Sequence, residues 1–90
     1  MDFEELRREA EKQLIEFLRT DLELARIFVD SASRQLKRGE LEDYGKLLGQ
    51  AAKAINTIHY FGEKISDQNI RAEIQHELEE LEDRLFSHKD

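Results

Sequence analysis

The feature that most constrains this chain is a long N-terminal stretch, residues 2–38, that contains neither glycine nor proline. These two residues are the ones that destabilise a helix interior most, so nothing in the stretch requires a helix to stop. Apolar residues recur through it at intervals of three and four, which places them on one face of an α-helix. They are Leu14, Leu18, Leu22, Ala25, Val29, Ala32 and Leu36. We therefore expect residues 2–38 to be helical.

One position inside this stretch could begin a new helix. Thr20 and Glu23 have the spacing of a capping box, in which each side chain accepts a hydrogen bond from the other residue's backbone amide. The apolar spacing nevertheless continues across position 20, as a single helix would require. We favour a kink or short break here, with residues 2–19 as an N-terminal helix or extension and 20–38 as the first bundle helix. One continuous helix is the alternative.

Gly39 is expected to end this stretch, because only glycine adopts the left-handed conformation beyond a helix C-terminus without a steric cost. Residues 40–65 then form a second helix with a regular apolar seam. The seam consists of Leu41, Tyr44, Leu48, Ala51, Ile55, Ile58, Gly62 and Ile65. Residues 66–69 supply capping side chains, and a third helix follows over 67–86. Its apolar stripe consists of Ile70, Ile74, Leu78, Leu81 and Leu85.

Short connections at Gly39 and Ser66 require neighbouring helices to be antiparallel. The predicted fold class is therefore all-α: an antiparallel up-down-up three-helix bundle with an additional or continuous N-terminal helix. Ninety residues are enough for one modest core, so we expect a single helical domain over residues 1–90.

The charge balance disfavours two classes of partner. The chain has 21 acidic and 14 basic residues and a net charge of −7, which opposes binding to nucleic acid or to an anionic membrane surface. No stretch is long and apolar enough to span a bilayer, and the acidic N-terminus is unlike a signal peptide. Cysteine is absent, which excludes disulfides and thiolate sites. We expect a cytoplasmic protein that binds neither membrane nor nucleic acid.

A pattern of small residues resembles that of a tetratricopeptide-type helix pair. It comprises Ala25, Ala32, Gly39, Gly45, Leu48, Ala51, Lys53, Ala54 and Ile55, with Gly39 at the turn. Together with the following segments 69–74 and 81–85, the chain is similar to microtubule-interacting-and-trafficking domains. The resemblance implies an adaptor in which short helices dock between two of three helices.

Little in the sequence points to catalysis. The serines, Ser31, Ser33, Ser66 and Ser87, lack the glycine-rich elbow or phosphate loop that accompanies a reactive serine. We therefore expect no enzyme, no catalytic residues and no cofactor. A metal-binding bundle is a minor alternative, because His59 and Glu63 are four residues apart and Glu73 and His76 have the spacing used in di-iron bundles. In a hairpin that turns near residue 66, His59 and Glu73 could approach each other, although His76 should point away from the core.

Two sets of residues are candidates for partner binding. Gly45, Gly49 and Ala52 form a smooth stripe beside the seam of the second helix, and either another helix of the chain or a partner helix could fill it. The other set is apolar surface beyond the needs of three helices, widened by Leu24, Ile27 and Phe28. Its candidate residues are Phe3, Leu6, Leu14 and Phe17. Tyr60 should be exposed and could anchor a contact.

These observations favour a non-catalytic helical protein–protein interaction module. Its partner would be a foreign helix or a second copy, with a homodimer through the N-terminal helix as one form. The alternatives are a self-associating structural helical protein and the metal-binding bundle.

Overall fold

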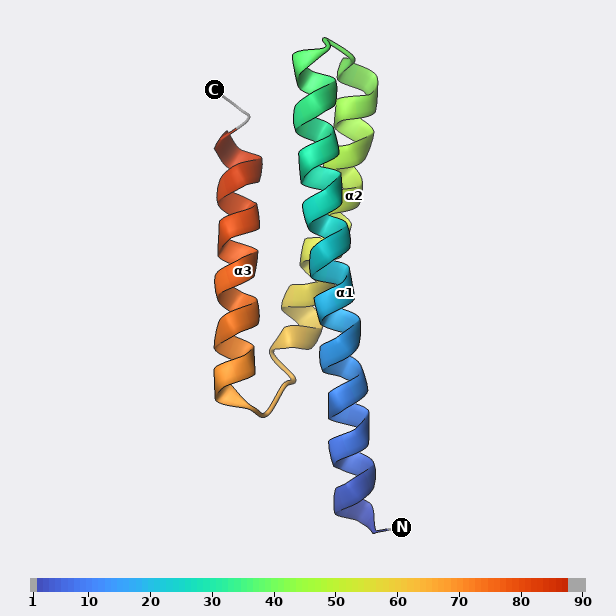
Figure 1. Cartoon of the computed structure of the whole chain (residues 1–90), viewed down its shortest axis with the longest axis vertical. Helices are drawn as coiled ribbons and strands as arrows, with labels where there is room; N and C mark the ends of the chain where they lie inside the picture. Colours follow the sequence, from blue (N-terminus) through green and yellow to red (C-terminus); the bar gives the residue numbers. More distant parts are fainter. Residues whose placement is uncertain (1, 88–90) are drawn as a thin grey trace.

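The computed structural model describes residues 2–87 and contains three helices. They are α1 (Phe3–Lys37), α2 (Leu41–Gly62) and α3 (Gln68–Ser87). Figure 1 shows α1 and α2 running antiparallel and α3 returning in the direction of α1, which gives the predicted up-down-up order. The all-α three-helix fold is confirmed.

The favoured break at position 20 is wrong, because α1 is one helix of 35 residues. The hydroxyl of Thr20 donates a hydrogen bond to the carbonyl oxygen of Glu16 at 3.1 Å, a bond made within a continuous helix. The N-terminal cap is instead Asp2, whose carboxylate accepts from two amides of the first turn. Leu18 and Leu22 are fully buried on either side of Thr20. Their packing requires one unbroken helical register, which outweighs the local capping signal.

The predicted turn at Gly39 is confirmed. Gly39 has a φ of 77°, and the amides of Gly39 and Glu40 donate to the carbonyls of Leu36 and Gln35 at 3.1 and 3.0 Å. This is the Schellman arrangement that satisfies the last carbonyls of a helix.

α2 ends at Gly62 rather than at residue 65, although Ile65 is still buried at 1% exposure. The apolar pattern thus continues into the loop, because Ile65 packs on the core without being helical. Asp67 then caps α3 by accepting from the amides of Asn69 and Ile70 at 2.9 and 3.2 Å.

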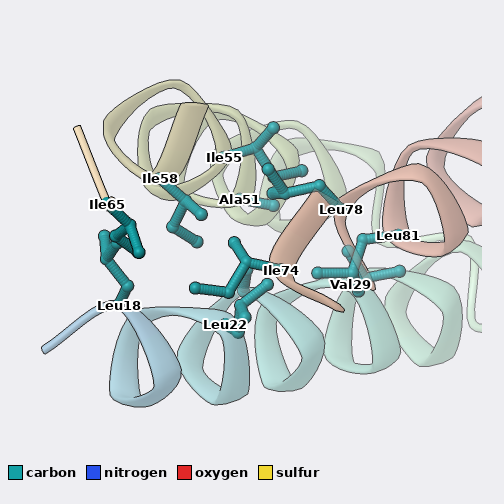
Figure 2. Packing of buried hydrophobic residues seen from close by; sticks show 11 residues of the cluster. Leu18, Leu22, Val29, Ala51, Ile55, Ile58, Ile65, Ile74, Leu78 and Leu81 are labelled. Carbon is teal, nitrogen blue, oxygen red and sulfur yellow. The ribbon is translucent and has the colours of Figure 1, made fainter. Parts of the chain in front are cut away.

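The core is formed by one stripe from each helix and by Ile65. Its buried residues are Leu18, Leu22, Ala25, Val29, Ala51, Ile55, Ile58, Ile65, Ile74, Leu78 and Leu81. Figure 2 shows Ile65 directed toward Leu18 and Leu81 lying beside Val29. The small buried residues Ala25 and Ala51 let α1 and α2 approach closely, and this pair makes the most extensive helix contact.

Leu22 and Leu24 form a matched pair for testing this core, because they lie on one helix at 1% and 43% exposure. We expect Leu22→Ala to lower the free energy of unfolding by about 2–5 kcal/mol, since it leaves a cavity. Leu24→Ala should change it by less than about 0.5 kcal/mol. Urea unfolding followed by circular dichroism measures both, and equal losses would contradict the burial pattern.

Thr20→Ala distinguishes a continuous α1 from a capped break. In a helix interior alanine is the better residue, so we expect the free energy of unfolding to rise by up to about 0.5 kcal/mol. Loss of an N-cap would instead lower it by about 0.5–2 kcal/mol. Thermal and urea unfolding of the two proteins give the sign.

Candidate functional site

The N-terminal end of α1 extends past the loop that joins α2 to α3 (Figure 1). Residues 2–10 are all exposed. Phe3 and Leu6 in this projecting end are 74% and 52% exposed. The surplus apolar surface at the start of the chain is therefore left open to solvent.

This open surface continues along the bundle as a single line of apolar residues. We call it the α1 stripe: Phe3, Leu6, Ala10, Phe17, Leu24 and Ile27. Every member is exposed, and Phe17, Leu24 and Ile27 are exposed at 49%, 43% and 55%. The spacing of three, four and seven residues matches a coiled-coil seam in which the polar residues Gln13 and Thr20 take the two intervening positions. The stripe spans about 36 Å at 1.5 Å per residue.

The α1 stripe faces away from α3. Arg19 pairs with Glu73 of α3 at 3.4 Å, and Arg19 lies roughly 200° round the helix from Phe17. Asp30, farther along α1, also pairs with Arg84 of α3, and it lies only about 60° from Ile27, so α3 borders the stripe at that end. The core and α3 thus occupy the other sides of α1 and leave the stripe uncovered.

Among the predicted residues of the N-terminal set, Phe3, Leu6 and Phe17 belong to the stripe. Leu14 does not, because it is half-buried and packs against the core. Leu24 and Ile27 belong to the predicted apolar surplus but not to the predicted partner-binding residues. The pattern that could have identified them as such is the seven-residue step from Phe17 to Leu24 and the three-residue step from Leu24 to Ile27.

The second predicted surface lies on α2. Gly45, Gly49 and Ala52 are exposed, and a Cβ added at either glycine would have no neighbouring atom within 4 Å. The interpretation that another helix of the chain fills this stripe is therefore wrong. Ala52 borders a hollow of about 360 Å³ between α2 and α3. The hollow is lined by Leu48, Ala52, Ile55, Asn56, His59, Glu82 and Leu85.

His59 bridges this hollow. Its Nε2 lies 2.5 Å from Oε1 of Glu82 on α3. The predicted approach of His59 to Glu73 is wrong, because Glu73 faces Arg19 of α1 instead. Figure 1 shows that α3 begins below the end of α2. The part of α3 that His59 contacts is near its C-terminal end, at Glu82.

The residues of the metal alternative do not converge. His76 pairs with Glu80 of its own helix at 3.1 Å, while His59 pairs with Glu82. Within residues 2–87 no three or more histidine, aspartate or glutamate side chains are grouped so as to hold a metal ion.

Tyr60 is exposed at 61%, as predicted. Its ring packs edge-to-face on Phe61 at 4.9 Å, and Nζ of Lys64 lies 4.5 Å from the ring centre. These contacts hold the ring at the C-terminal end of α2.

One contact that sequence reasoning missed secures α1 where it leaves the bundle. The Glu11 carboxylate accepts hydrogen bonds from the Ser66 hydroxyl at 2.7 and 2.9 Å and from the Ser66 amide. These bonds stabilise the ionised carboxylate and lower the pKa of Glu11. Glu11 is one of many glutamates in the chain, so its spacing gives no signal.

Comparison with known protein families, curated proteins and solved structures finds no match to this chain. The resemblance to tetratricopeptide-type and microtubule-interacting-and-trafficking domains therefore stays a prediction. In residues 2–87 no helix is long and apolar enough to cross a membrane.

Glu11→Gln should lower stability in a pH-dependent way. Because the pKa of Glu11 is lowered in the folded state, its contribution is present above the unfolded pKa and is lost as pH falls through the folded pKa. We expect the urea midpoint of the variant to lie below that of the wild type at pH 7, with a smaller difference near pH 3. Glu9→Gln, which removes an exposed carboxylate two residues earlier on the same helix but has no Ser66 contact, is the control. A deficit that does not depend on pH would contradict this role.

Proposed function

We propose that this chain is a non-catalytic protein-interaction domain that binds an amphipathic helix along the α1 stripe. The observation that carries the proposal is the exposure of five large apolar side chains on one line of one helix. Large exposed apolar patches are uncommon on monomeric proteins, and they often mark interaction surfaces. The seam-like spacing favours a helix as the partner, because a helix repeats its side chains with the same period.

The energetics of the stripe are adequate for a specific contact. Complete burial of a large apolar side chain contributes about 1.5–3 kcal/mol, and the stripe offers several such side chains that are about half exposed or more. Because α1 is continuous and its base is tied to the α2–α3 loop through Glu11, the surface is ordered before binding. A preformed surface loses less conformational entropy on association.

The hollow between α2 and α3 is a weaker candidate for the same function. It is about 360 Å³ in volume and is bridged by the contact between His59 and Glu82. A helix entering it would have to displace that contact. The α1 stripe requires no such rearrangement.

The proposal can be tested with a synthetic helical peptide of four heptads that has leucine at positions a and d and glutamine at e and g. We expect measurable binding to the wild-type chain by fluorescence anisotropy, at peptide concentrations where sedimentation shows the peptide to be monomeric. The double variant Phe17→Ser with Leu24→Ser should weaken binding at least about tenfold, because two central contacts are lost.

The control is Leu41→Ser with Tyr60→Ser, which removes two large exposed apolar side chains from α2, at 65% and 61% exposure. Its affinity should equal that of the wild type, and all proteins should retain their helical circular dichroism. Absence of binding by the wild type, or an equal loss in the control, would overturn the proposed function.

A further inference from the structure

We infer that the helix bound by the α1 stripe carries lysine or arginine along the border of its own apolar seam. The inference rests on the proposed function and adds the charge of the partner to it. The residues that flank the stripe carry different charge on its two sides, and the inference is drawn from this difference.

One border of the stripe is an acidic row. Glu9, Glu16 and Glu23 each come one residue before a stripe member, and they repeat every seven residues as the stripe does. All three are exposed, and no ion pair found in residues 2–87 includes them. Asp30 continues the row, but its carboxylate is paired with Arg84. The three glutamates therefore face solvent along the edge of the apolar surface.

The opposite border offers little charge to a partner. It comprises Arg7, Leu14, Asp21 and Phe28, each four residues after a position of the stripe. Leu14 and Phe28 pack against the core. The Arg7 guanidinium lies over the Phe3 ring at 5.8 Å, so the one basic side chain of this border is already placed against the stripe.

Lys12 and Arg19 lie farther from the stripe than the acidic row does, because each follows a stripe member by two residues, roughly 200° round the helix. Arg26 also follows Leu24 by two residues, but it directly precedes the stripe member Ile27. Arg19 is directed to Glu73 of α3. A helix lying on the stripe would meet the glutamates first.

This charge pattern argues against a second copy as the occupant. In an antiparallel pair the two acidic rows would face each other across the seam, and like charges opposed in this way disfavour association. In a parallel pair the acidic row of one copy would face the opposite border of the other copy. That border has Arg7 as its one basic residue and Asp21 as an acidic one, so most of the glutamates would have no basic partner. Each copy also brings a net charge of −7. A basic helix meets neither obstacle.

The test uses two further peptides with the same leucine seam, one with lysine and one with glutamate at the e and g positions. We expect the lysine peptide to bind at least about tenfold more tightly than the glutamate peptide, and the difference to shrink as salt is raised. The triple variant Glu9→Gln, Glu16→Gln and Glu23→Gln should abolish most of this preference while still binding the glutamine peptide.

A control triple variant, Asp43→Asn, Glu63→Gln and Glu79→Gln, changes the net charge equally at exposed positions on α2 and α3 and at the end of α2. It should keep the preference. Equal loss in this control would show that net charge alone is responsible and would overturn the inference.

The remaining outcomes separate the inference from the proposed function. If the three peptides bind equally and the double variant Phe17→Ser with Leu24→Ser loses them all, the inference fails while the proposed function stands. If sedimentation instead shows a wild-type dimer that the same double variant converts to a monomer, a second copy occupies the stripe and the inference is overturned.

Discussion

The whole arrangement depends on a mismatch in length between α1 and the two helices that pack on it. α1 has 35 residues, while α2 and α3 have 22 and 20, so they can cover only part of its length. Their apolar stripes also reach only one side of α1, where Leu18, Leu22 and Val29 are buried. Two neighbouring helices cannot cover the whole circumference of α1, so one side of it stays exposed to solvent. The projecting end of α1 follows from the difference in length, and the exposed stripe follows from the side of α1 that α2 and α3 leave uncovered.

The parts of the fold that sequence could predict are those decided by local pattern. Leu18, Ala25 and Val29 are buried because they share a helical face, and Gly39 turns the chain because its φ is positive. The break at Thr20 was mispredicted because a capping box and a continuing apolar seam are both local signals, and only tertiary packing decides between them. The register of α3 was misjudged for a similar reason. It depends on how far the loop after Gly62 travels before Asp67 starts the helix.

The candidate site likewise has features that the local sequence pattern predicts and features that depend on tertiary packing. That Phe3, Leu6 and Phe17 are more than the core needs could be inferred from apolar surplus. The exposure of Phe17 depends on where α2 and α3 pack, whereas Phe3 and Leu6 are exposed because α1 extends past both helices. α3 docks through its buried residues Ile74, Leu78 and Leu81, and exposed pairs such as Arg19 with Glu73 accompany that docking. The sequence does not predict which acidic residue each arginine will pair with, because the chain has 21 acidic residues and several of them are equally suitable partners. The interpretation that another helix of the chain fills the stripe at Gly45 and Gly49 is wrong for a different reason: small residues permit a close neighbour without requiring one.

The unequal borders of the α1 stripe give the proposed function a source of selectivity that apolar contact alone lacks. An exposed seam of Phe17, Leu24 and Ile27 would accept any helix with a matching apolar face, including the same seam of another copy. A row of glutamates beside it weakens that self-pairing, because each copy presents the same sign of charge. The apolar residues would then supply most of the affinity, and the acidic row would decide which helices can use it. Selection by charge also acts during diffusion, before the apolar surfaces meet, so it would limit unproductive encounters as well as wrong complexes.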